Sequence, residues 1–175
     1  MDFIDMGKCN NINDTYLCSW TWSFAVAIVF FTLALIGVLH HEPWRDEAYP
    51  WLVARDNSNL LSAILESRYS MRPALWCLLL FLPSHLGDPI LMQLLSIGVA
   101  TVSVLLFTRF APFIKLSKLL FAFSYYPLFE YGILARDYVI EVLALFLFCL
   151  SYQQAKPLWL QCLILAVLCN TNSYG

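Results

Sequence analysis

The densest set of acid–base side chains in this chain lies between residues 40 and 47. The segment holds His40, His41, Glu42, Arg45, Asp46 and Glu47. A carboxylate within hydrogen-bond reach of a hydroxyl group can remove its proton and make it a nucleophile. A carboxylate can also hold a divalent metal beside a leaving phosphate. We therefore take this segment as the candidate centre of the chain's chemistry.

The two neighbouring carboxylates of this segment cannot serve one substrate equally. Adjacent positions on a helix point about 100° apart. We assign the reaction to Asp46 and a supporting role to Glu47, with His41 and Glu42 as candidate metal ligands. The alternatives are that the acids only favour the first turn of a helix through its macrodipole, and that the histidines lie at a membrane interface.

A second polar set surrounds Arg136 and Asp137, with Glu130 and Glu141 nearby. An arginine can bind two oxygens of a phosphate at once. Glu141 stands in an otherwise apolar run, where an unpaired carboxylate is costly, so we expect Arg136 or Arg72 as its partner. The alternative for this set is a structural ion pair at an interface.

The composition indicates a membrane protein. Hydrophobic residues make up 61% of the chain and charged residues 13%, against about 25% charged in an average soluble domain. The net charge of −2 and the absence of a basic patch in the sequence argue against nucleic acid as a partner. The six cysteines form no Cys-x-x-Cys pair, so we interpret them as small apolar residues.

The apolar runs predict an all-α integral membrane protein with about five transmembrane helices. Trp20–Leu39 carries no formal charge and is long enough to cross about 30 Å of hydrocarbon. The other expected spans are 89–108, 119–129 (extendable over 116–134), 139–152 and 157–169. Residues 1–19 form a cytoplasmic segment, and 20–175 form the transmembrane domain.

Residues 40–88 form a polar loop that contains amphipathic segments. The stretches 47–55 and 57–66 have apolar residues near helical spacing, so we expect short helices in the plane of the interface. The run 73–82 is apolar but too short to span, and it predicts an interfacial or re-entrant helix. Arg109, Lys115 and Lys118 follow the second span, which places them inside and the 40–88 loop outside. The Arg136 turn then shares the outer face with Asp46.

Together these motifs resemble the membrane-embedded GT-C glycosyltransferases, specifically family 39 and the bacterial relatives of dolichyl-phosphate-mannose enzymes. The resemblance covers nearly the whole chain from His40 onward. Each motif is weak by itself, and the ordered set is specific. The motifs are Trp44-Arg45-Asp46-Glu47, Arg72-Pro73-Ala74-Leu75-Trp76, Gly87-Asp88-Pro89, Tyr131 to Tyr138, and Thr171 to Gly175.

The resemblance implies transfer of a sugar from a polyprenyl-phosphate carrier to a lipid, glycan or protein acceptor, usually with inversion. It implies a multi-pass location in a bacterial inner membrane, in contact with membrane lipid. No cofactor is certain, and a divalent metal stays open. The implied catalytic residues are Asp46 and Glu47, and the implied substrate-binding residues are Arg45, Arg72, Arg136 and Tyr138.

The chain also departs from the family pattern. The family's His-Pro-Pro start is Arg72, Pro73 and Ala74 here, and relatives have more spans. The polar ending after the last apolar run predicts a fragment. The alternatives are therefore a truncated, non-catalytic membrane protein or interaction subunit, and a small transporter or flippase. Intramembrane charges mark transport pathways, but the sequence shows no inverted repeat.

Overall fold

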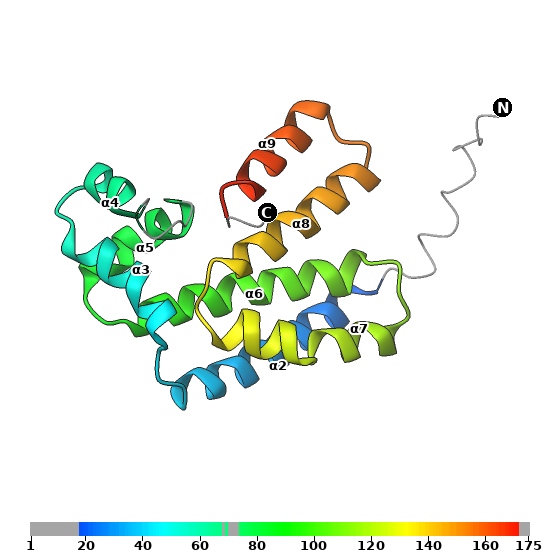
Figure 1. Ribbon diagram of the computed structural model, residues 1–175. Coiled ribbons are helices and arrows are strands. Elements are labelled where there is room, and N and C mark those ends of the chain that lie inside the picture. The colour runs from blue at the N-terminus through cyan, green and yellow to red at the C-terminus, as the bar shows by residue number, and fades with distance from the viewer. Residues whose placement is uncertain (1–17, 68, 70–73, 172–175) are drawn as a thin grey trace.

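The computed structural model describes residues 18–67, 69 and 74–171, and this part of the chain is entirely helical (Figure 1). The segment 1–17, Arg72 and Pro73, and the part of the last motif over 172–175 lie outside it. The helices, in chain order, are α2 (Trp20–Leu39), α3 (Arg45–Asp56), α4 (Leu60–Ser67), α5 (Ala74–Leu86), α6 (Ile90–Phe110), α7 (Lys115–Ala122), the π-helix η3 (Tyr126–Ile133), α8 (Tyr138–Gln153) and α9 (Leu158–Leu168).

The two longest helices meet the length and composition needed to cross a membrane. These are α2, with 20 residues, and α6, with 21. The other expected spans correspond to shorter helices, of which α8 has 16 residues and α9 has 11. The prediction of an all-helical chain is confirmed for the described residues, and two of the five expected spans are supported by length and composition.

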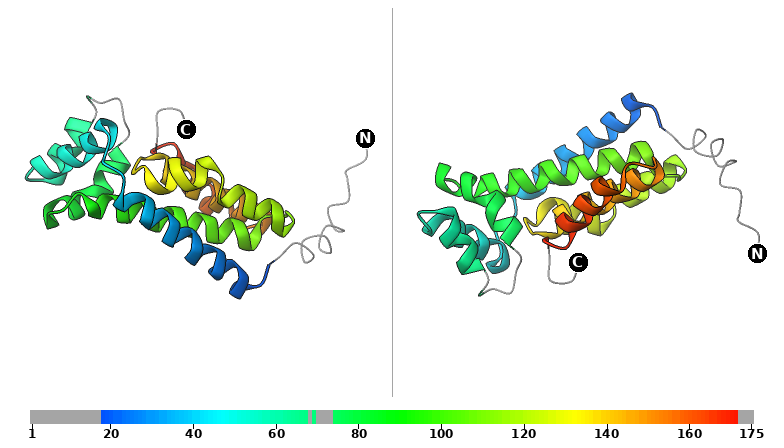
Figure 2. Two further views of the ribbon diagram at one scale, coloured as in Figure 1. Left: turned by 90° about the horizontal axis from the view of Figure 1, so that it is seen from below. Right: turned by 90° about the horizontal axis from the view of Figure 1, so that it is seen from above.

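Helix α6 lies at the centre of the bundle. It packs against α2, η3 and α8, while α9 packs on α8 (Figure 2). The buried positions of α2 and α6 include many small residues, such as Ala27, Ala34, Ser96 and Ala100. Small side chains let helix backbones approach closely, which is how helices associate where lipid removes the hydrophobic driving force.

The outward faces of the bundle are apolar. On α2, Ile28, Val29 and Ile36 are exposed, and in α9 no residue is buried. A helix that is hydrophobic all round is typical of a membrane span or of the core of a large protein. The exposed faces of α2 and α9 are therefore apolar surface, and of these two helices α2 is long enough to cross a membrane.

The loop 40–88 forms a separate group of three helices at one end of α6 (Figure 1). Helix α3 packs against α5, and their buried residues include Trp51, Ala54, Trp76 and Leu80. The three short helices expected here are present. Helix α5 continues through Pro83 to Leu86, beyond the predicted end at residue 82.

The third expected span is divided in two. Helix α7 ends at Ala122, and the π-helix η3 begins at Tyr126. Pro127 has no N–H and cannot donate to the carbonyl four residues earlier, which disfavours a regular α-helix at this point. The chain instead closes wider turns, as in the bond from the Leu134 N–H to the Phe129 carbonyl (3.0 Å). π-Helical segments are rare and are found frequently at functional sites.

Candidate functional site

The fully buried carboxylate of Glu47 joins the 40–88 loop to the turn between η3 and α8. Its Oε1 accepts a hydrogen bond from the Ala135 N–H at 2.7 Å. Its Oε2 accepts from the Trp44 N–H at 2.8 Å and from His41 Nε2 at 2.9 Å. The Trp44 contact satisfies a backbone donor at the start of α3, as the glutamate of a capping box does. Glu47 therefore holds its two neighbours in the chain, Asp46 and Ala48, in fixed positions.

Asp46 points away from Glu47 and is more than half exposed. Its Oδ2 lies 3.5 Å from Nη2 of Arg136. The structure thus separates the two adjacent carboxylates as their helical spacing requires, with one buried and one facing solvent. The exposed part of this carboxylate is accessible to a substrate hydroxyl.

The guanidinium of Arg136 lies between two carboxylates without a tight hydrogen bond to either. Its Nη1 is 3.8 Å from Oε1 of Glu130, and its Nη2 makes the 3.5 Å contact with Asp46. Its Nε is buried and has no hydrogen-bond partner among the described residues. The Trp44 ring covers the guanidinium at 5.5 Å. Arginine carries five N–H donors, so this side chain retains capacity for a phosphate.

A cleft of about 330 Å³ opens beside Glu130. Its walls are the η3 and α8 residues Tyr126, Glu130, Tyr131, Tyr138, Glu141, Val142 and Leu145. Carboxylates and tyrosine hydroxyls bind the hydroxyl groups of sugars, and aromatic faces pack against sugar rings. Glu130 both lines the cleft and pairs with Arg136, so it connects the charged cluster to the cleft.

Tyrosine side chains surround the carboxylate of Glu130. Tyr126 and Tyr131 line the cleft beside it. Tyr125 donates to Oε2 of Glu130 at 3.5 Å from outside the cleft.

Several residues expected from the sequence lie together, and others do not. Asp46, Glu47, Arg136 and Tyr138 all contribute to this site. Arg45 is exposed at the start of α3 and Glu42 is exposed before it, whereas His40 bonds the Ile36 carbonyl at 2.8 Å. Among these upstream residues, His41 is the one whose side chain bonds Glu47 within the described part of the chain.

Of the two partners expected for Glu141, Arg136 pairs with other carboxylates, and Arg72 lies outside the described residues. Arg136 forms ion pairs with Asp46 and Glu130, and Glu141 instead lines the cleft. Sequence reasoning also missed the roles of Trp44, Tyr126 and Tyr131. For the two tyrosines, the available signal in the sequence was the density of tyrosines around Glu130. No group of three or more metal-ligating side chains occurs within residues 18–67, 69 and 74–171.

Comparisons with known proteins leave the site to be interpreted from its geometry. No protein-family model, no curated protein and no solved structure matches this chain. What the site can do must therefore be argued from its cation, its exposed carboxylate and its cleft.

Proposed function

We propose that this chain is a membrane glycosyltransferase of the GT-C type that takes its sugar from a polyprenyl-phosphate carrier. The observation that supports the proposal is the position of Arg136. It lies between the exposed Asp46 and Glu130, directly beside a cleft rich in tyrosine and carboxylate. A cation that can bind phosphate, an exposed carboxylate that can act as a base, and a cleft lined by carboxylates and tyrosines are the three parts that such a transfer needs.

The proposed placement is a multi-pass protein with the 40–88 loop outside. Helices α2 and α6 would span the bilayer, and α7 with η3, α8 and α9 would complete five passages. The distribution of charge supports this orientation. The sequence has no Asp or Glu in 89–129 or 142–175, and these stretches hold Arg109, Lys115, Lys118 and Lys156. Basic residues concentrate on the cytoplasmic side of membrane proteins.

In the proposed reaction, Arg136 binds the phosphate that links sugar to carrier. Asp46 takes the proton of an acceptor hydroxyl as the hydroxyl oxygen attacks the anomeric carbon. The bond between that carbon and the phosphate oxygen breaks, and the polyprenyl phosphate leaves with the electron pair. Arg136 stabilises the charge that develops on the leaving phosphate. Attack opposite the leaving group inverts the anomeric centre.

The test is Asp46→Asn in native membranes supplied with polyprenyl-phosphate sugar. The amide keeps the size of the side chain but cannot act as a base, so transfer should fall by roughly 10²–10⁴-fold. Membrane insertion should not change, because Asp46 is exposed. Asp56→Asn is the matched control, since Asp56 is also an exposed acid of α3 and bonds Arg55. Undiminished transfer by Asp46→Asn would remove Asp46 from the reaction.

A further inference from the structure

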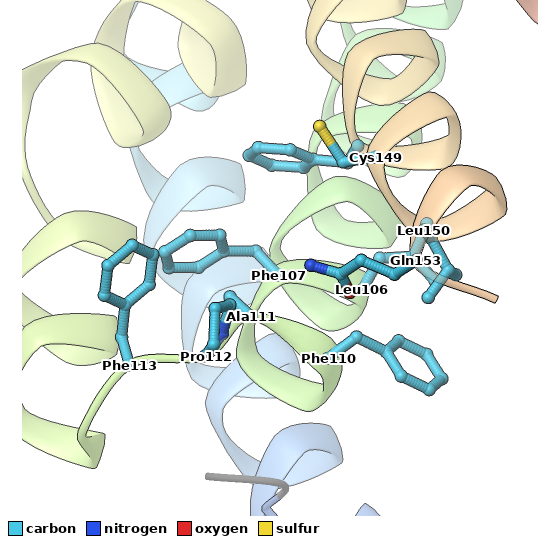
Figure 3. A pocket seen from close by; sticks show the side chains of 10 residues that line it. Leu106, Phe107, Phe110, Ala111, Pro112, Phe113, Cys149, Leu150 and Gln153 are labelled. Carbon is cyan, nitrogen blue, oxygen red and sulfur yellow. The ribbon is translucent and has the colours of Figure 1, made fainter. Parts of the chain in front are cut away.

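A second cleft, of about 200 Å³, lies at the end of α6 opposite the 40–88 loop. Its walls come from the last turns of α6, the loop that follows, and the second half of α8. Figure 3 shows Phe107 and Phe113 on one side, with Leu150 and Gln153 of α8 across from them. The ring of Phe107 lies 6.0 Å from that of Phe113. This lining suits a hydrocarbon chain and offers little to a polar ligand.

One basic side chain contacts a wall of this apolar cleft, and a second follows it in sequence. The guanidinium of Arg109 lies 5.3 Å from the ring of Phe110, a wall of the cleft, and 5.2 Å from the ring of Trp20. The Nε of Arg109 is buried and has no hydrogen-bond partner among the described residues. Lys156 is exposed and follows the cleft residue Gln153 by three positions. Because 89–129 and 142–175 contain no acid, these stretches supply no carboxylate of their own to neutralise the cations.

We propose that this cleft binds an acyl chain of an anionic phospholipid. The chain would lie among the phenylalanines, and Arg109 and Lys156 would attract the headgroup phosphate. Each basic residue near an anionic membrane surface contributes to binding, and basic pockets at the inner ends of helices hold anionic headgroups. The inference rests on the membrane placement proposed above, but it does not depend on sugar transfer.

The experiment uses native mass spectrometry of the whole chain released from detergent. The protein is exchanged into phosphatidylglycerol or into phosphatidylcholine with the same acyl chains. We expect phosphatidylglycerol to be retained preferentially. Arg109→Gln or Lys156→Gln should each reduce that retention roughly fivefold. Since Lys156 is exposed, its substitution does not threaten the fold.

A second variant tests the apolar half of the site. Cys149 is exposed and lines the cleft, so Cys149→Phe should fill it and reduce retention of both lipids. Leu163→Phe on the exposed surface of α9 is the matched control and should retain lipid normally. Equal retention of the two lipids by the native chain would overturn the proposal, as would unchanged retention by Cys149→Phe.

The outcomes also separate this proposal from the one on function. If carbonate washing releases the chain from membranes, the membrane placement fails and the lipid site fails with it. If lipid retention follows the predicted pattern but no sugar is transferred, the lipid site stands and the proposed enzymatic function fails.

Discussion

The carboxylate of Glu47 and the backbone N–H of Ala135 lie 2.7 Å apart, although 88 residues separate them in the chain. This bond attaches the first polar loop to the turn that carries Arg136. Asp46 directly precedes Glu47 in the chain, and Arg136 directly follows Ala135. The bond between Glu47 and Ala135 therefore brings the two charged residues close together. Their 3.5 Å approach therefore depends on a buried contact that takes no direct part in the proposed chemistry.

Glu47→Gln should weaken this attachment. A glutamine offers one carbonyl oxygen, so its NH₂ group would face one of the three donors that now point at the carboxylate. A buried polar group left unsatisfied costs about 1–3 kcal/mol. For a chain of this size each kcal/mol lowers Tm by about 2–4 °C, which a thermal shift assay in detergent can detect.

The matched control for that variant is Glu42→Gln. Glu42 is exposed and lies five residues before Glu47, so its substitution should leave Tm unchanged. Equal Tm values for the two variants would show that the buried bonds of Glu47 contribute little to stability.

The sequence was sufficient to predict the helices that depend on apolar runs. The run 20–39 forms α2 with the same bounds. An uncharged stretch of this length with polar residues at both ends indicates one continuous helix. It was not sufficient for the division of 115–133 into α7 and η3. The same apolar pattern fits one helix or two, and Pro127 was the single local sign of a break.

The site was predictable as a set of residue types but not as a set of contacts. Helical geometry alone indicated that Asp46 and Glu47 face different ways. The partners of Arg136 were not predictable, because Asp46 is 90 residues away and pattern arguments do not measure distances between loops. Glu141 lines the cleft and does not pair with Arg136, while Arg72, the other partner expected for it, lies outside the described residues.

Arg136→Lys tests whether this residue binds the donor phosphate. Lysine keeps the charge but loses the planar fork that binds two phosphate oxygens. Loss of one charged hydrogen bond, about 1.5–3 kcal/mol, corresponds to a decrease in kcat/KM of roughly 10–150-fold. Transfer rates measured over a range of donor concentrations check this.

An ion pair with only a structural role predicts a different result for the same variant. Lysine could still pair with Asp46 and Glu130, so activity would persist and any loss would follow Tm. Arg55→Lys is the control, because Arg55 is exposed and bonds Asp56 at 2.7 Å. A normal kcat/KM for Arg136→Lys would exclude the phosphate-binding role.

Gly132→Ala should destabilise the contact between η3 and α2. A Cβ at position 132 would lie 3.2 Å from the Pro127 carbonyl and 3.3 Å from the ring of Phe30. Overpacking of a buried site costs about 1–3 kcal/mol.

Gly98→Ala is the matched control in α6, where a Cβ meets nothing within 4 Å. Replacing a helical glycine there should stabilise the chain by about 0.4–1 kcal/mol. Thermal unfolding of both variants would show opposite shifts, and a higher Tm for Gly132→Ala would contradict the close packing.

Lys118→Met should loosen α7 from the end of α6. The ammonium of Lys118 is fully buried, and its Nζ donates to the Thr108 carbonyl at 2.8 Å. That carbonyl belongs to the last turn of α6, where helical carbonyls lack partners within the helix. Methionine fills the space but leaves the carbonyl unsatisfied, at a cost of about 1–3 kcal/mol. Hydrogen exchange of the α7 amides should therefore accelerate and Tm should fall. Lys115→Met changes an exposed lysine of the same helix, so matching exchange rates in the two variants would show that the Thr108 bond does not hold α7 in place.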